Sequence, residues 1–401
     1  MEQKKDILML SVSRWDQELS SASISVAKEL SKNGRVFYFD HPFSFKDVIK
    51  GRKSPAIKRR LKALFLGRDL FTRIEPDNPN WIAVTPGITL PINWLPQGGI
   101  YNFLSRINNR IFFQAIRKTI DHYKITNFIY WNSYNPFFSY YLPDDIKPDL
   151  FIYQSRDNIA ESNYVKKHGP DLERKAAQFA DLRIATSMDL TNRLSRPGIE
   201  FIFFPNAAQT DIFKKAQSRS MPVPQEIKGI DRPIIGYIGN ICLRQDYDLL
   251  YKIAEKFQDH ILLMVGPRND RNYNRYDFSK LKNVIFTGPK KLEELPNYLA
   301  YMDVTILPFL VNDLTRSIYP LKLNEYLAAG KPVVATNFSP DVQSFSKVIY
   351  VSSSHEEFIE NIRKGLLEHS DDLRLKRIQS VEKNSWENRV KEFWNLMNTN
   401  L

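Results

Sequence analysis

The chain has 401 residues, of which 43% are hydrophobic and 25% charged, values typical of a globular protein with two or three domains. Lysine and arginine outnumber aspartate and glutamate by 57 to 45, and the net charge of +12 favours anionic partners such as phosphorylated small molecules, anionic lipids or nucleic acid. The single cysteine, Cys242, excludes an intramolecular disulfide framework and a cysteine-rich zinc site. No segment approaches the ~18 apolar residues that span a bilayer, and the N-terminus lacks a signal-peptide core, so we expect a cytoplasmic protein.

Short apolar runs alternate with helical patterns through the first half of the chain. Strands are predicted at residues 7–10, 35–40, 81–84, 127–131, 150–153, 182–186 and 201–204. Helices are predicted at residues 21–30, 107–123 and 172–179. This alternation is typical of a parallel sheet flanked by helices.

A polar stretch with two prolines, at residues 214–232, interrupts the alternation and is the best linker candidate. Strands are then predicted at 233–238, 261–265, 283–286, 304–307, 332–335 and 348–351, and helices at 248–257, 292–301 and 321–329. We therefore predict an α/β fold of two doubly wound domains with a cleft between them. The domains would comprise residues 1–213 and 233–373, and residues 374–401 would form a C-terminal helix that could pack back on the N-terminal domain.

The first strand of the second domain ends in a glycine turn, Gly236-Tyr-Ile-Gly239-Asn240. Glycine lets a backbone approach a ligand phosphate, and the start of the next helix offers free N–H groups. The turn matches neither the dinucleotide-binding fingerprint nor a Walker A sequence. A tight turn between strand and helix without a ligand is therefore an equally good interpretation.

A second motif, at residues 316–334, places two charged side chains at a helix start. Pro320 suits the first turn of a helix and Gly330 suits its end, so Lys322 and Glu325 share one face near the N-terminal end. The lysine suits a diphosphate, and the carboxylate suits two neighbouring sugar hydroxyls. The alternative is an ion pair on the surface of the helix.

This motif, RSIYPLKLNEYLAAGKPVV, resembles the most diagnostic segment of group 1 glycosyltransferases of the GT-B fold, nucleotide-sugar enzymes with two facing Rossmann-like domains. Residues 204–213 resemble a second family segment, although Ala207 and Gln209 replace its glycine and aspartate. The resemblance covers the whole chain and is strongest in residues 204–340. It implies that the diphosphate lies on Lys322 and Arg316 and the ribose on Glu325, within a donor-binding set of Gly239, Asn240, Arg244, Arg316, Tyr319, Lys322 and Glu325.

The chain departs from that family in two places. Many retaining members have a glutamate eight residues before the ribose contact, where this chain has Ser317, and many have an arginine and a lysine where Asn240 and Gln245 stand. The chain is more similar to teichuronic-acid enzymes and to the inverting glucuronosyltransferase of xanthan assembly. That similarity implies an inverting transfer.

Two aspartates of the first domain are candidates for the catalytic base. Asp157 directly follows a strand that is predicted to be buried, and in the xanthan-type enzyme an aspartate at this place supplies the base. The alternative is that Asp157 caps the next helix. Asp16, in the loop after the first strand, is the second candidate, and its alternative is to cap the following helix together with Ser20.

No metal or cofactor is predicted besides the nucleotide-sugar substrate. The six histidines show no metal-binding spacing. Asp246-Tyr-Asp248 looks like the metal-binding D-x-D of the other glycosyltransferase fold, but it opens a helix, so we expect Asp246 to cap that helix.

Residues 46–68 hold nine basic residues and one acidic residue. Four apolar residues follow a helical period, Ile57, Leu61, Leu64 and Phe65, and the other faces carry Lys58, Arg59, Arg60 and Lys62. A basic amphipathic helix suits an anionic membrane surface, so we predict a peripheral protein on the inner face of the cell membrane. The alternatives are a solvated helix packed on the domain and a nucleic-acid patch, for which the sequence has no matching fold motif.

Together these features predict a hexosyl- or glycuronosyltransferase that moves a sugar from a nucleotide diphosphate to a lipid-linked or polysaccharide acceptor in cell-surface glycan synthesis. The alternatives are a retaining enzyme of the same fold and a nucleotide-sugar epimerase, which needs no acceptor. A non-enzymatic alternative is a basic protein that binds lipid or nucleic acid.

Overall fold

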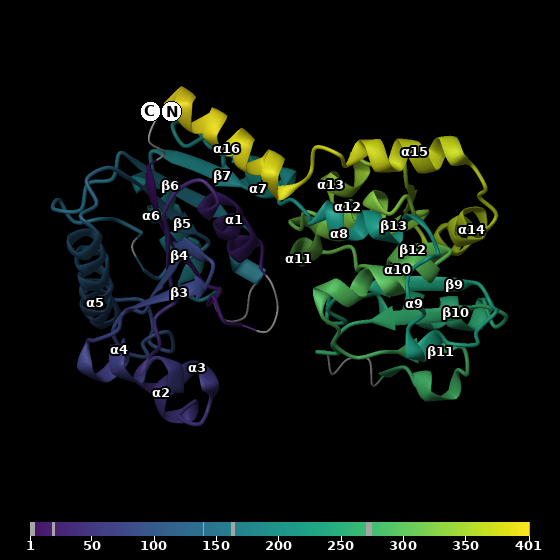
Figure 1. Cartoon of the computed structure of the whole chain (residues 1–401), viewed down its shortest axis with the longest axis horizontal. Coiled ribbons are helices and arrows are strands. Elements are labelled where there is room, and N and C mark those ends of the chain that lie inside the picture. Colours follow the sequence, from purple (N-terminus) through teal and green to yellow (C-terminus); the bar gives the residue numbers. More distant parts are fainter. Residues whose placement is uncertain (1–4, 18–20, 139, 162–164, 270–274, 401) are drawn as a thin grey trace. The chain divides into compact units, whose positions relative to one another are not determined.

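The computed structural model describes residues 5–17, 21–138, 140–161, 165–269 and 275–400. The chain divides into two compact units (Figure 1). The first unit comprises Met1–Thr186, Leu190–Phe204 and Val390–Leu401, and the second comprises Ser187–Asp189 and Pro205–Arg389. Each unit has its own sheet and its own hydrophobic core, so each is an α/β domain by itself.

The first unit is built on an eight-stranded sheet of order β3-β4-β2-β1-β5-β6-β7-β8. Neighbouring strands are parallel except β3 and β4, which are antiparallel. The strands are β1 (Asp6–Ser11), β2 (Val36–Phe39), β3 (Phe71–Glu75), β4 (Asn78–Val84), β5 (Phe128–Ser133), β6 (Leu150–Ser155), β7 (Leu182–Ala185) and β8 (Ile202–Phe203).

The central strands of this sheet are apolar along most of their length because helices cover both faces. Every residue of β2, β5 and β6 is buried. The seven strands predicted for this half are confirmed. The strand β3 was not predicted, because it is an edge strand with only partial burial and a mixed sequence, and it joins β4 through a tight hairpin.

The helices of the first unit include α1 (Ala22–Ser31), α2 (Phe45–Lys50), α3 (Pro55–Arg59), α4 (Leu61–Leu66), α5 (Gly99–Tyr123), η1 (Ile159–Glu161), α6 (Gly169–Phe179), most of α7 (Met188–Leu194) and most of α16 (Trp386–Asn400). Phe393 of α16 stacks on Trp131 of β5, with ring centroids 4.8 Å apart. The last helix therefore completes the hydrophobic packing of the first unit.

The prediction of one continuous amphipathic helix through residues 57–65 is wrong. Three short helices, α2, α3 and α4, project from one end of the first unit (Figure 1), and breaks fall at Gly51 and Arg60. Arg60 leaves the helical conformation, with φ −105° and ψ 5°, and its side chain turns inward to pair with Asp40. Of the four apolar positions, Ile57 and Leu64 are buried, in a small core with Phe43 and Val48.

The second unit has a six-stranded, all-parallel sheet of order β11-β10-β9-β12-β13-β14. Its strands are β9 (Ile234–Ile238), β10 (Ile261–Val265), β11 (Val284–Phe286), β12 (Val304–Leu307), β13 (Val333–Thr336) and β14 (Tyr350–Ser352). All six predicted strands of this half are confirmed, and the order is that of a doubly wound sheet.

The helices of the second unit are α8 (Thr210–Lys214), α9 (Tyr247–Lys256), α10 (Leu295–Tyr301), α11 (Asp313–Arg316), α12 (Leu321–Ala328), α13 (Pro340–Gln343), α14 (His355–Leu366) and α15 (Asp371–Ser380), with the 3₁₀ helices η2 (Lys215–Gln217), η3 (Gln225–Ile227), η5 (Phe278–Lys280) and η6 (Leu292–Glu294). Asp246 caps α9 by accepting the N–H of Leu249 at 3.0 Å, as predicted.

Candidate functional site

The strands β9 and β12 lie side by side in the second sheet, where the winding direction reverses. The chain runs from β9 to β10 and β11 on one side, and from β12 to β13 and β14 on the other. Doubly wound sheets bind ligands beyond the carboxyl ends of such strands. Here the two loops are tied together: the Asp246 N–H donates to the Pro308 carbonyl at 2.8 Å, and the Leu310 N–H to the Arg244 carbonyl at 2.9 Å.

Two glycines at this edge adopt a backbone conformation that favours glycine. Gly239, after β9, and Gly266, after β10, both have φ of +141°. A Cβ on Gly266 would lie 2.1 Å from the carbonyl oxygen of Gly239, and a Cβ on Gly239 would lie 2.1 Å from Cε of Lys322. The glycine turn therefore serves close packing. Gly266 was not among the predicted site residues, although its place directly after a buried strand was a usable signal.

The side chain of Lys322, in the first turn of α12, lies over the backbone of Gly239. Its Nζ would be 2.7 Å from a Cβ at that glycine, and it lies 5.7 Å from the centroid of the Tyr237 ring. Burial lowers the pKa of Lys322; the charge of Glu325 opposes this shift and the charge of Arg244 adds to it. Lys322 forms no ion pair with any residue that the structure describes, so its ammonium group is available to an anion.

Glu325 follows Lys322 by one helical turn and is also partly buried. Burial raises the pKa of Glu325 to about 7, and the charge of Lys322 offsets part of that rise. Within the described ranges the carboxylate accepts no hydrogen bond and forms no ion pair. The surface ion pair between Lys322 and Glu325, the predicted alternative, is therefore absent, and within the described residues neither side chain has an ion-pair partner.

The position of α12 is fixed to the end of β9 by a buried tyrosine. The Tyr326 hydroxyl accepts the N–H of Ile238 at 2.8 Å and donates to the carbonyl of the same residue at 3.3 Å. Asn324 accepts a hydrogen bond from the side chain of Asn384 at 2.9 Å. These contacts fix the position of the first turn of α12, and with it Lys322 and Glu325, relative to the glycine turn.

Two further predicted donor-binding residues lie in the loop after β9. The side-chain oxygen of Asn240 accepts a hydrogen bond from Asn269 at 2.8 Å, and its carbonyl accepts one from the Tyr237 hydroxyl at 3.0 Å. The charge of Arg244 is close enough to act on the pKa of Lys322. Its guanidinium has no ion-pair partner in the part of the chain that the structure describes.

The other two predicted donor-binding residues precede α12. Tyr319 is buried, and its hydroxyl accepts a hydrogen bond from the Asn324 side chain at 3.3 Å, so it supports the helix start. Arg316 forms an ion pair with Asp189 at 3.2 Å, and the Ser317 hydroxyl donates to the same carboxylate at 2.6 Å. The charge of Arg316 is therefore already engaged by a carboxylate.

In the first unit, Asp157 follows β6 at the carboxyl edge of the sheet. Its carboxylate accepts no hydrogen bond from the residues that the structure describes. Asn158 accepts the N–H of Ala160 at the start of η1, at 3.2 Å, so the capping role proposed as the alternative for Asp157 belongs to its neighbour. Arg156, beside it, donates to the Ser23 hydroxyl, and burial lowers the pKa of Arg156.

Asp16 is held by two arginines. Its carboxylate accepts from Arg60 at 2.7 and 2.8 Å and from Arg59 at 2.6 Å. Burial alone would raise the pKa of Asp16, but the hydrogen bonds and charges of the two arginines lower it. A carboxylate with a lowered pKa and three guanidinium contacts is a poor proton acceptor, so the structure favours a structural role for Asp16. Ser21 caps α1, and Ser20 lies outside the described residues.

The four residues predicted to bind a membrane differ in exposure. Lys58 and Lys62 are exposed, and Arg59 is exposed although it pairs with Asp16. The prediction for Arg60 is wrong, because its side chain is 3% exposed and pairs with Asp16 and Asp40. Large apolar side chains lie exposed on the same helices: Phe45, Ile49, Leu61, Phe65 and Leu66. We call these five residues, with Lys58 and Lys62, the apolar–basic face. Across the described ranges, no helix has the length and apolar character needed to cross a bilayer.

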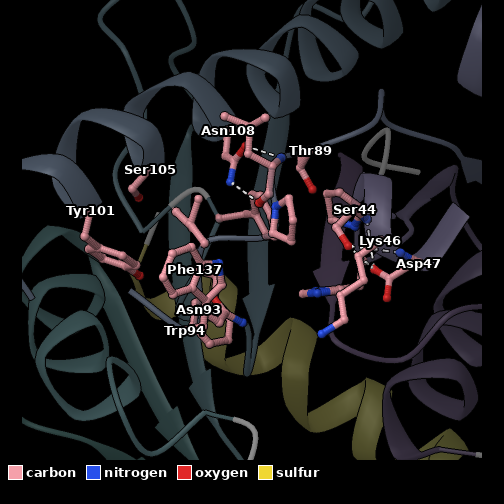
Figure 2. A pocket seen from close by; sticks show the side chains of 16 residues that line it. Ser44, Lys46, Asp47, Thr89, Asn93, Trp94, Tyr101, Ser105, Asn108 and Phe137 are labelled. Atoms are coloured by element: carbon pink, nitrogen blue, oxygen red, sulfur yellow. Dashed lines mark hydrogen bonds between the residues drawn. The ribbon is translucent and has the colours of Figure 1, made fainter. Parts of the chain in front are cut away.

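A cavity of about 360 Å³ opens in the first unit between α2, the loop of residues 89–94 and α5. Figure 2 shows Tyr101, Ser105 and Asn108 on one side of it and Ser44, Lys46 and Asp47 on the other. The wall is held in place by Asn108, whose side chain accepts the N–H of Leu90 at 2.8 Å and donates to its carbonyl at 3.0 Å. Sequence patterns did not reveal this cavity, because its lining comes from four separate segments, within residues 41–47, 89–94, 101–108 and 137–138.

Residues 232–368 match the family model described as glycosyl transferases group 1. Over 175 residues the chain is 32% identical to a Bacillus subtilis relative provisionally named as the teichuronic acid biosynthesis glycosyltransferase TuaH. That match covers 42% of this chain and 43% of the relative, so it spans less than half of either.

Solved structures resemble the chain over nearly its whole length. Sucrose-phosphate synthase from Thermosynechococcus elongatus aligns with a TM-score of 0.69 at 14% identity, covering 99% of both chains. A glycosyltransferase from Rickettsia africae gives 0.64 at 14% identity, covering 99% of this chain and 98% of the other. Anabaena HepE, in a complex with UDP and glucose, gives 0.66 at 11% identity, covering 99% of this chain and 100% of the other. Identities this low show a shared fold, which confirms the predicted GT-B architecture of two Rossmann-like domains.

Proposed function

We propose that the protein transfers a sugar from a nucleotide diphosphate to an acceptor, because residues 232–368 match the group 1 glycosyltransferase model and the chain has the GT-B fold. The observation that carries the proposal is the pair of Lys322 and Glu325 beside the Gly239 turn, neither of which forms an ion pair within the described residues. A cation and a hydroxyl acceptor, one helical turn apart at the switch point of the sheet, match the diphosphate and ribose of a nucleotide.

In this proposal Lys322 and Arg244 bind the diphosphate. Neither has an ion-pair partner within the described residues, and each adds to the positive potential around the other. A diphosphate would relieve that repulsion and supply charge-assisted hydrogen bonds. Arg316 would need to leave Asp189 to take part, so we assign it a secondary role in donor binding.

Glu325 would accept hydrogen bonds from the two ribose hydroxyls. Its carboxylate is ionised in only part of the molecules near neutral pH, because burial raises its pKa to about 7. A diphosphate bound to Lys322 would hold the Lys322 ammonium in place next to the Glu325 carboxylate. Gly239 and Asn240 would line the phosphate path, and the buried Tyr319 would support the start of α12. No metal or cofactor is part of the proposal.

We further infer an inverting transfer with Asp157 as the general base. A single displacement at the anomeric carbon needs one carboxylate that takes the proton of the acceptor hydroxyl. Within the described residues the carboxylate of Asp157 forms no hydrogen bond or ion pair, although its charge acts on the neighbouring Arg156, whereas that of Asp16 is held by Arg59 and Arg60. This difference supports Asp157 over Asp16.

For the acceptor we propose a lipid-linked or polysaccharide glycan of the cell surface, reached by a protein bound peripherally to the inner face of the membrane. The relative named for teichuronic acid biosynthesis supports the class of acceptor. The apolar–basic face supports the membrane contact, because exposed apolar side chains can enter the headgroup region while lysines attract anionic lipid. In a vesicle sedimentation assay, Phe65→Ser with Leu66→Ser should release the protein from anionic vesicles; unchanged binding would refute the contact.

A thermal-shift panel of UDP-, GDP- and dTDP-sugars tests the donor assignment. We expect one nucleotide class to raise the melting temperature of the wild type and to have little effect on Lys322→Met. Lys256→Met, a change at an exposed lysine of α9, is the matched control. An epimerase would convert the donor without an acceptor, and a non-enzymatic lipid- or nucleic-acid-binding protein would show no shift with any nucleotide sugar.

A further inference from the structure

We propose that the cavity between α2 and α5 binds an uncharged sugar unit of the acceptor. The inference rests on the proposed glycosyltransferase function and adds to it a site and a class of ligand. A volume of about 360 Å³ is within the range of small-molecule sites, which starts at about 300 Å³.

Two hydroxyl groups without partners point to a polar ligand. Tyr101 and Ser105 lie one turn apart on α5, are 5% and 6% exposed, and line the cavity (Figure 2). In the described chain neither side chain has a hydrogen-bond partner. Neither hydroxyl oxygen is among the fully buried, unpaired polar atoms of the described chain, so both open onto the cavity and can hydrogen-bond to a polar molecule in it.

The wall that carries these hydroxyls is rigid. The Tyr101 ring stacks on His168, with centroids 3.8 Å apart and an interplanar angle of 8°. The Nε2 atom of His168 is 3.0 Å from the Leu95 carbonyl. Because its partners fix the ring, the Tyr101 hydroxyl is held in position before a ligand arrives, which lowers the entropy cost of binding.

Aromatic side chains complete the match to a sugar. Trp94 is 73% exposed at the cavity, and Phe137 lies near it in Figure 2. A sugar ring presents C–H groups on its faces and hydroxyls on its edge. The faces can pack on aromatic rings while the edge bonds to hydroxyl and amide groups, here Tyr101, Ser105 and the side chain of Asn93.

The charges of the lining favour a neutral ligand. Burial, together with the charge of Arg14, lowers the pKa of His41 to about 3, so this lining residue is neutral at physiological pH. Lys46 and Asp47, on the exposed helix α2, are the charged residues of the described lining, and they have opposite signs. A phosphate or a carboxylate would therefore find no net positive charge inside the cavity.

Saturation-transfer NMR on the full chain tests the proposal, with neutral methyl glycosides of glucose, galactose and N-acetylglucosamine as probes and methyl glucuronide and inorganic phosphate as anionic comparisons. The variants are Tyr101→Phe and Ser105→Ala, which remove one hydroxyl each and keep the packing, and Tyr123→Phe on the same helix is the control. We expect a neutral glycoside to bind the wild type and the control, and each variant to lose about 2- to 10-fold in affinity. Since neither hydroxyl has a protein partner, the melting temperatures should not change.

The proposal is overturned if no neutral glycoside binds, if the anionic probes bind in preference, or if both variants bind as the wild type does. Titrations with UDP, GDP and dTDP are run on the same samples. If none of the three nucleotides binds the wild type, the donor assignment is refuted and the cavity result stands alone. If a nucleotide binds and no neutral glycoside does, only the cavity proposal is refuted.

Discussion

Replacing Lys322 by methionine tests the central element of the proposed donor site. Methionine keeps most of the length of the side chain over Gly239 and removes the charge. A hydrogen bond to a charged group contributes about 1.5–3 kcal/mol, and 1.4 kcal/mol is about a factor of ten in affinity. The affinity for UDP should therefore fall by about 10- to 150-fold, and Arg244 should retain part of the binding.

The same substitution should not weaken the fold. Burial lowers the pKa of Lys322, so the folded protein binds this proton less tightly than the unfolded chain does. At pH values below the ordinary lysine pKa of 10.5, which include neutral pH, this difference lowers the free energy of unfolding. Lys322→Met removes this effect, and the melting temperature without ligand should stay the same or rise.

Isothermal titration with UDP and differential scanning fluorimetry measure the two quantities, with Lys256→Met as the control. An affinity within about twofold of the wild type, in a variant with normal melting temperature, would show that the phosphates do not bind at Lys322. A large drop in melting temperature would contradict the stability argument, because it would mean that the ammonium stabilises the fold.

Three further predictions concern carboxylates. Because burial raises the pKa of Glu325 to about 7, the free energy of unfolding should decrease as pH rises from about 4.5 to 7. UDP affinity, measured by titration, should increase about tenfold from pH 6 to 8 as the carboxylate becomes ionised. Glu325→Gln or 2′,3′-dideoxy-UDP should abolish that pH dependence, and an affinity that still rises with pH would refute the ribose role. Asp157→Asn should lower transfer about 10²–10⁴-fold in a radiolabelled-sugar assay with unchanged UDP affinity and melting temperature, and a rate above about a tenth of wild type would exclude it as the base. Asp16→Asn should lower the free energy of unfolding by about 1–3 kcal/mol in urea, because a buried guanidinium loses a charged partner, and lost transfer with normal stability would instead support Asp16 as the base.

The sequence predicted the strands well because parallel strands covered on both faces are short, continuous apolar runs. It did not predict β3, whose sequence FTRIE alternates poorly and is only partly buried at the sheet edge. The alternation of strands and helices predicted doubly wound sheets, whereas the order of the strands and the reversal between β9 and β12 appeared only in the structure.

The failure at residues 57–65 has a different cause. The helical period there is real, but Arg60 has buried partners at positions 16 and 40, and no local pattern reveals a partner so distant in sequence. The same limit applies to the donor site. Spacing placed Lys322 and Glu325 on one helix face, whereas the contact of Lys322 with the Gly239 backbone depends on tertiary packing and appeared only in the structure.

The ion pairs of Arg60 join α3 and α4 to the body of the first unit. One guanidinium spans Asp40, at the end of β2, and Asp16, in the loop after β1, and it is nearly sealed from water. A force applied to the short helices is therefore transmitted to the carboxyl edge of the sheet through these salt bridges, and not only through the connecting loops. If these helices rest on a bilayer, the ion pairs of Arg60 fix the angle between the carboxyl edge of the sheet and the membrane plane.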